Sequence, residues 1–130
     1  MAVDTNKPSS ANWWKWFDPR ARDVGTWAFI LNRITALGLT LYLFLHLVVL
    51  STLAQGPQAY ESFLNLIKNP IYTFGELLVV IAGIYHGLNG IRIGWTTFFK
   101  GAPIQKQILY VVLVVALIFI IFFAIRMFTT

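Results

Sequence analysis

The 130-residue sequence contains no cysteine, and this absence excludes several kinds of site. Disulfide bonds, thiolate zinc sites, cysteine-ligated iron–sulfur clusters and haem attachment through a CxxCH motif all require that residue. Charged residues are also scarce: they make up 12% of the chain, about half of their usual share in a soluble domain. The composition therefore predicts a membrane protein. No removable signal peptide is expected, because the first 26 residues form no continuous apolar run.

Three long apolar stretches remain, and each is long enough for a transmembrane helix, which needs about 20 residues. We expect these helices at about 27–54, 71–99 and 107–126. A short helix is expected around 60–67. The predicted fold is an all-α membrane protein with an N-terminal cytoplasmic tail and interfacial segment (1–25) and a three-helix transmembrane domain (26–130).

The interfacial segment is predicted from tryptophans that follow a polar tail. Tryptophan favours the membrane–water interface, because its ring is apolar and its N–H needs a hydrogen-bond partner. The same rings are equally suited to packing on a partner subunit, and the two interpretations are compatible. The residues concerned are Trp13, Trp14 and Trp16.

Basic residues lie near the edges of the apolar stretches and do not form a continuous track. Before the first stretch stand Lys7, Lys15, Arg20 and Arg22, and between the second and third stand Lys100 and Lys106. The loop between the first two stretches holds only Lys68. The positive-inside rule then predicts a cytoplasmic N-terminus and an external C-terminus. The net charge of +5 does not indicate nucleic-acid binding, since such a site needs clustered basic residues.

Ionisable residues within membrane spans are costly and mark functional sites. The third stretch carries none between residues 108 and 125, so we expect it to be a structural or lipid-facing helix. The first two stretches therefore hold the candidate site. Their ionisable residues are Arg33, His46, Glu76, His86 and Arg92.

His86 stands beside a strip of glycines. At about 100° per residue, these glycines fall within about 60° of one another on a helix, so a flat group or a neighbouring helix can approach closely. Imidazole is a common axial ligand of haem, and Arg92, about 9 Å further along the helix, can reach a haem propionate. A tight helix–helix contact explains the glycines equally well, and an interfacial anchor explains Arg92. The strip consists of Gly83, Gly87, Gly90 and Gly94.

His46 shares one face of the first helix with polar residues such as Thr35 and Tyr42, so this face is expected to meet protein or a cofactor. A lone buried histidine is more often hydrogen-bonded than metal-bound, and both roles stay open. Measured from Arg33 and Arg92, the two histidines differ by about 10 Å in depth, which disfavours one haem held between them. The chain has two histidines, so a haem with two histidine ligands requires a partner chain.

Two segments, ILNRITA (30–36) followed by His46, and YHGLNGIR (85–92), resemble the cytochrome b membrane-anchor subunit of succinate dehydrogenase (succinate:quinone oxidoreductase, complex II). The family pattern is His-Arg-x-(Ser/Thr)-Gly in the first helix and His-x-x-x-Gly-x-Arg in the second. The first segment departs from this pattern. Its differences are Asn32 in place of histidine, Ala36 in place of glycine, and Phe29 where a quinone-binding serine is often found.

The resemblance implies half of a two-chain haem-binding helix bundle. Haem b would have His86 as its proximal axial ligand and Arg92 as a propionate partner, against the surface that contains Gly83 and Gly90. His46 stands where family members with a second, distal haem carry its ligand. The resemblance also implies a quinone site that involves Trp27, Asn32, Arg33 and Thr35.

The resemblance further implies a multi-pass subunit of the cell (inner) membrane that helps electrons to pass from succinate to quinone. Its expected partners are a second membrane-anchor subunit, an iron–sulfur subunit and a flavoprotein subunit, and no catalytic residue is expected in this chain. The alternative is a haem-free structural anchor or a small proton or ion transporter subunit with a relay of Glu76, His86 and Arg92. A distance of about 15 Å along the helix between Glu76 and His86 weakens that relay.

Overall fold

The computed structural model describes Arg20, residues 23–100 and residues 102–130. The predicted interfacial segment and its tryptophans lie outside the described residues, and the division of the chain at residue 25 stays a prediction. The elements in chain order are α1 (Val24–Ser51), the 3₁₀ turn η3 (Thr52–Gln55), α2 (Pro57–Ile67), α3 (Pro70–Phe98), the 3₁₀ turn η4 (Ala102–Ile104) and α4 (Gln105–Thr129).

Three helical segments are long and apolar enough to cross a membrane: Val24–Gln55, Pro70–Phe98 and Gln105–Thr129. The described part of the chain contains no strand. The all-α fold with three membrane-spanning helices is therefore confirmed. The observed ends lie within three residues of the predicted ones, and the short helix α2 begins three residues earlier than expected.

Local sequence signals explain where α2 and α3 begin. Gly56 has a φ of 111°, a backbone conformation that glycine adopts without steric cost, and it turns the chain from η3 into α2. Proline occupies the first turn of both helices, at Pro57 and Pro70, where the missing N–H is not needed. The Asn69 side chain caps α3 by accepting a hydrogen bond from the backbone N–H of Ile71 at 3.0 Å.

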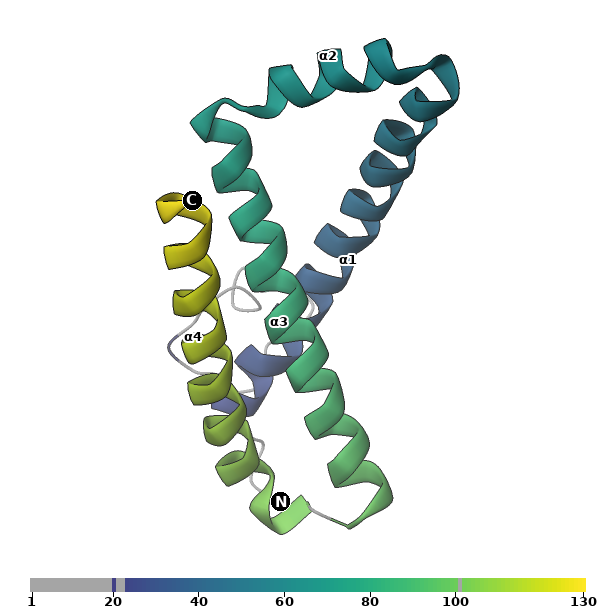
Figure 1. The fold of residues 1–130 in the computed structure, drawn as a ribbon. Coiled ribbons are helices and arrows are strands. Elements are labelled where there is room, and N and C mark those ends of the chain that lie inside the picture. Colours follow the sequence, from purple (N-terminus) through teal and green to yellow (C-terminus); the bar gives the residue numbers. More distant parts are fainter. Residues whose placement is uncertain (1–19, 21–22, 101) are drawn as a thin grey trace.

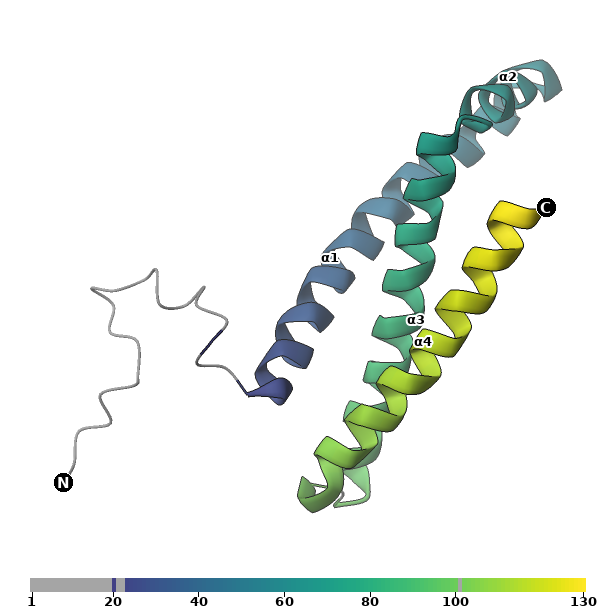
Figure 2. The ribbon, with the colours of Figure 1, turned by 90° about the vertical axis from the view of Figure 1, so that its left-hand side faces the viewer.

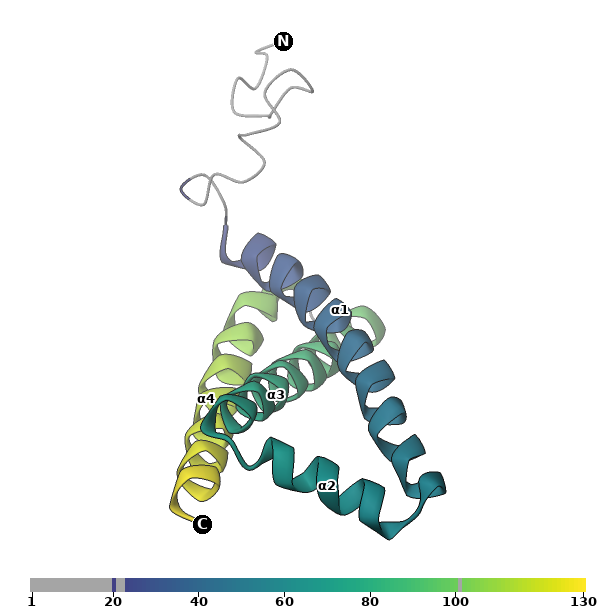
Figure 3. The same cartoon turned by 90° about the horizontal axis from the view of Figure 1, so that it is seen from above.

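The helices α1 and α3 cross as an X, and α4 lies along α3 (Figure 1). Beyond the crossing, the second half of α1 diverges from α3, and α2 bridges the two separated ends (Figure 3). The C-terminus lies at the same end of the molecule as α2, whereas η4 lies at the opposite end (Figure 2). The only close approach of α1 to α3 is therefore at the crossing.

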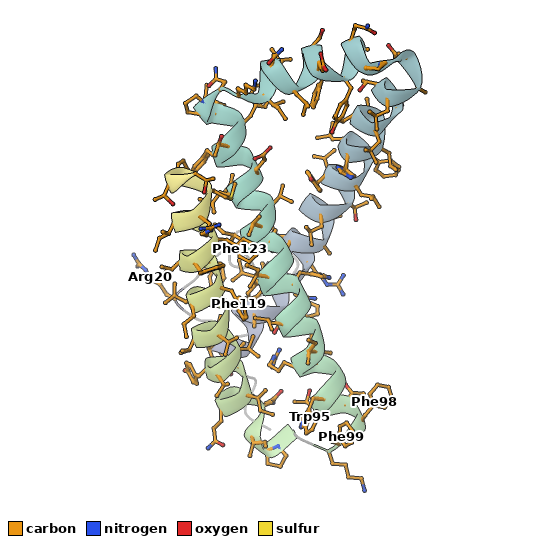
Figure 4. All side chains as sticks on the ribbon, in the orientation of Figure 1. Arg20, Trp95, Phe98, Phe99, Phe119 and Phe123 are labelled. Atoms are coloured by element: carbon orange, nitrogen blue, oxygen red, sulfur yellow. The ribbon has the colours of Figure 1, made fainter. Side chains whose placement is uncertain are left out.

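Few of the described side chains are buried in the isolated chain. The buried residues are Ala28, Tyr85, Asn89, Arg92, Leu109 and Ala116. A thin core is expected for membrane helices, because lipid covers their apolar side chains and small residues allow close contact. The apolar side chains of α4, such as Phe119 and Phe123, extend from the helix surface (Figure 4).

Aromatic side chains gather where α3 ends, at Trp95, Phe98 and Phe99 (Figure 4). The rings of Trp95 and Phe99 lie 4.5 Å apart between centroids, and all three side chains are exposed. Aromatic residues are enriched at the membrane–water interface. This end also carries the ion pair between Lys106 and Asp23, with nitrogen and oxygen 3.2 Å apart, so it marks one membrane boundary.

Candidate functional site

Polar side chains of α1 and α3 meet at the helix crossing. Asn89 donates through Nδ2 to Oδ1 of Asn32 at 3.0 Å, and Arg92 donates through Nε to Oδ1 of Asn89 at 2.9 Å. Tyr85 donates through its hydroxyl to the carbonyl oxygen of Ala28 at 2.7 Å. Polar groups within a membrane must find partners inside the protein, and these bonds provide them.

His86 joins the same crossing through one ring nitrogen. Its Nδ1 lies 3.2 Å from the carbonyl oxygen of Asn32 and 3.2 Å from Oγ1 of Thr35. The Thr35 hydroxyl also lies 2.8 Å from the carbonyl oxygen of Leu31. Both hydrogen-bonding contacts of His86 thus use Nδ1, and within the described part of the chain Nε2 has no hydrogen-bond partner. The half-buried ring keeps one nitrogen free for a ligand from outside this cluster.

The glycine strip is open in this chain. Gly83, Gly87 and Gly90 are exposed, and a Cβ atom built on any of the four glycines, Gly94 included, meets no neighbouring atom within 4 Å. The strip lies roughly 160° around α3 from the buried polar face that packs on α1. A tight contact between two helices of this chain therefore does not explain the glycines, and a close neighbour on this face must come from outside the described residues.

Arg92 is 8% exposed. An interfacial anchor extends its charged end into water or among headgroups, so this burial does not match the anchor interpretation. The guanidinium is held by Asn89 on one side. Arg92 lies six residues after His86, about 9 Å further along α3 and about 120° around it.

His46 lies away from the crossing of α1 and α3. It lies eleven residues after Thr35, which is about 16 Å along α1, on the half of the helix that diverges from α3 (Figure 1). Its exposed ring stacks on Tyr42 with centroids 5.6 Å apart. The two histidines therefore lie at separate levels. The distance of about 16 Å along α1 is larger than the difference of about 10 Å in depth that the sequence predicts.

The four residues predicted for a quinone site are divided by the structure. Asn32 and Thr35 lie at the crossing beside His86. Trp27 and Arg33 are exposed and lie about 120° apart around α1, each more than about 100° away from the face that packs on α3. The Arg33 guanidinium lies over the ring of Phe29 at 4.6 Å. Only part of the predicted set therefore forms one cluster.

Sequence reasoning missed Tyr85 and Asn89, which complete the crossing. Together with Arg92 they recur at positions i, i+4 and i+7 on α3, and this spacing marks one helix face. The described residues contain no group of three or more histidine, cysteine, aspartate or glutamate side chains that could hold a metal ion. This chain can thus offer an iron centre one ligand at each histidine.

Comparison with known proteins was made on sequence. Residues 4–125 match the family model described as succinate dehydrogenase/fumarate reductase transmembrane subunit. The chain is 32% identical over 91 residues to the succinate dehydrogenase 2 membrane subunit SdhC of Mycobacterium tuberculosis, covering 69% of this chain and 67% of that protein. It is 35% identical over 91 residues to a succinate dehydrogenase hydrophobic membrane anchor subunit of Halobacterium salinarum, covering 69% and 70% of the two chains.

Proposed function

Because the chain belongs to the succinate dehydrogenase/fumarate reductase transmembrane subunit family and is a membrane-anchor subunit of succinate dehydrogenase, we propose that it binds haem b and helps to form a quinone site. The main support is the arrangement of His86. Its Nδ1 is engaged by α1, its other nitrogen is uncommitted, and the glycine face beside it is open.

The residues present fit an axial haem site. His86 would be the proximal iron ligand, and the open surface at Gly83 and Gly90 leaves room for a flat group. Arg92 stays the proposed partner of a propionate, but Asn89 holds its guanidinium on the buried face of α3, away from the glycine strip. The Arg92 side chain would therefore have to leave that hydrogen bond to supply its positive charge to a propionate. When bound, the haem supplies one-electron redox chemistry. The chain's own contribution is to orient the ligand and to keep water away from it.

We propose His46 as the ligand of a second, distal haem. The separation of His46 from His86 means that each iron would take its other histidine from outside this chain. A second membrane-anchor subunit is the proposed source. The proposed iron–sulfur and flavoprotein subunits would oxidise succinate, and no residue of this chain is assigned a catalytic role.

The quinone proposal rests on four side chains in the first half of α1. Trp27 and Arg33 have exposed side chains, which a quinone ring and its carbonyl oxygens can approach. Asn32 uses Oδ1 within the chain and keeps its Nδ2 donors for another acceptor. Thr35 lies about one turn further along α1, and its Oγ1 is as close to Nδ1 of His86 as the Asn32 carbonyl oxygen is, at 3.2 Å.

The relay of the alternative transporter function has no support among the described residues. Arg92 is bonded to Asn89 and His86 to Asn32 and Thr35, and within the described residues no hydrogen bond or ion pair joins Glu76 to either of them. We therefore favour the electron-transfer function. We also propose a location in the cell (inner) membrane with the N-terminus in the cytoplasm.

The test is the reduced-minus-oxidised absorption spectrum of the purified complex. We expect a b-type band that His86→Ala removes, and a partial loss of the band in His46→Ala. An intact complex without a b-type band, or a band that His86→Ala leaves unchanged, would contradict haem binding at His86. An unchanged band in His46→Ala alone would contradict only the second haem.

A further inference from the structure

We propose that Asn32 and Thr35 are positioning residues, which hold His86 in the tautomer with its proton on Nδ1. The inference rests on the proposed haem function and assigns the two residues a task beyond it. Three polar atoms form a small triangle: Nδ1 of His86, the carbonyl oxygen of Asn32 and Oγ1 of Thr35, with sides of 3.2, 3.2 and 3.0 Å.

The number of protons available decides the tautomer. The carbonyl oxygen of Asn32 is an acceptor only. If Nδ1 of His86 carried no proton, its lone pair would face that oxygen at 3.2 Å with no hydrogen between them. The Thr35 hydroxyl has a single proton and would have to leave the closer carbonyl of Leu31, at 2.8 Å, to satisfy Nδ1.

Protonation at Nδ1 removes this conflict. Nδ1–H then donates to the carbonyl oxygen of Asn32, with Oγ1 of Thr35 as a second acceptor, and the Thr35 hydroxyl donates to Leu31. The lone pair of a neutral imidazole is then on Nε2, the nitrogen that would ligate iron from this ring. Hydrogen bonding at the opposite nitrogen also orients a ligating histidine and makes it a stronger donor.

Asn32 extends the same control to Arg92. Its backbone carbonyl contacts His86, whereas its side-chain oxygen accepts from Asn89, which in turn accepts from Arg92. One residue of α1 therefore fixes the positions of both groups that the proposed function places at the haem. A shift of α1 at this point would disturb both together.

The experiment measures the haem midpoint potential and the low-spin electron paramagnetic resonance signal in purified complexes. Thr35→Val removes one acceptor near Nδ1–H and keeps the carbonyl of Asn32, so the haem is retained. A weaker bond at Nδ1 lowers the donor strength of the imidazole, and we expect the midpoint potential to rise. The looser ring is expected to shift or broaden the low-spin signal.

Two matched variants separate positioning from general damage. Thr35→Ser keeps the hydroxyl and is expected to restore the wild-type potential and signal. Thr40→Val removes another hydroxyl of α1, one that donates to the backbone carbonyl of Ala36 in the same helix. This variant is expected to change neither the midpoint potential nor the low-spin signal. Thr35→Ala serves as a smaller replacement if the valine variant does not assemble.

The outcomes distinguish this inference from the proposed function. A b-type band that His86→Ala removes, with wild-type potential and signal in both Thr35→Val and Thr35→Ala, would refute positioning by Thr35 and leave haem binding intact. Equal shifts in Thr40→Val would refute it as well. A complex without any b-type band would overturn the proposed function, and this inference with it.

Discussion

Asn89 is the residue on which most of the polar contact at the helix crossing depends. It is fully buried, and both ends of its amide are used, by Asn32 on one helix and by Arg92 on its own. Interhelical hydrogen bonds in membranes contribute roughly 0.6–2 kcal/mol each. Removing one buried partner lowers stability by more than the free energy of the lost bond, because the polar groups left behind have no hydrogen-bond partner.

We therefore predict that Asn89→Leu destabilises the subunit by about 1–3 kcal/mol. The measurement is the thermal unfolding midpoint of the detergent-purified complex, together with the amount of this subunit that assembles. Asn65→Leu is the control, since Asn65 on α2 accepts a single exposed hydrogen bond, from Lys68 just after the helix. Equal midpoints for the two variants would show that the buried amide is not needed for stability.

At the level of single residues, the sequence predicts the charged groups and misses their partners. His86 and Arg92 are conspicuous because ionisable residues are rare in membrane spans. Tyr85 is not, since its acceptor is a backbone carbonyl at Ala28, 57 positions away, and a carbonyl has no sequence signature. Contacts between helices depend on the crossing geometry, which a single apolar stretch does not encode.

At the level of elements, α3 presents two faces with different neighbours. One face carries Tyr85, Asn89 and Arg92 and packs within the chain, whereas the glycine face is open. Because a Cβ atom built on this open face has no neighbour within 4 Å among the described residues, we expect a larger side chain there to affect chiefly what binds from outside. The strip can therefore be tested without disturbing the fold of the subunit.

Gly90→Leu is predicted to weaken haem binding and leave the subunit in the membrane. Overpacking of a tight contact amounts to about 1–3 kcal/mol, which corresponds to roughly 5- to 150-fold weaker binding. The measurement is the ratio of haem to protein in the purified complex. Gly75→Leu is the matched control, because Gly75 is equally open and lies off the strip near the start of the same helix. Normal haem content in Gly90→Leu would exclude close approach of the haem at this glycine.

The elements themselves follow from hydropathy, and their ends follow only to within three residues. Helix α4 continues to Thr129, three residues past the predicted end at Arg126, because a charged residue ends an apolar stretch but does not end a helix, and arginine is a good helix former. The sequence also does not predict which face of α4 packs against the other helices. Its apolar side chains lie all around the helix, and only Leu109 and Ala116 are buried, so no periodic pattern marks the contact face.

At the level of the whole molecule, the two ends differ in charge and in aromatic content. The end at which α3 passes into α4 has exposed aromatic rings and the ion pair of Lys106 with Asp23. This exposed pair adds little stability, but its lysine contributes to the positive charge that sets orientation. At the opposite end, Arg126 lies in the last turn of α4, where a cation is favoured by the helix dipole. Its presence there does not require that end to be cytoplasmic.

The absence of cysteine makes this orientation directly testable, because any single cysteine introduced into the chain is its only thiol. We predict that Ser62→Cys on α2 and Thr130→Cys at the C-terminus react with a membrane-impermeant maleimide in intact cells. Gln105→Cys, at the start of α4, is expected to react only after permeabilisation. All three positions are exposed and uncharged, so the substitutions leave the balance of basic residues unchanged. Labelling of Gln105→Cys in intact cells, with Ser62→Cys and Thr130→Cys protected, would reverse the topology and place the crossing of α1 and α3 near the outer face.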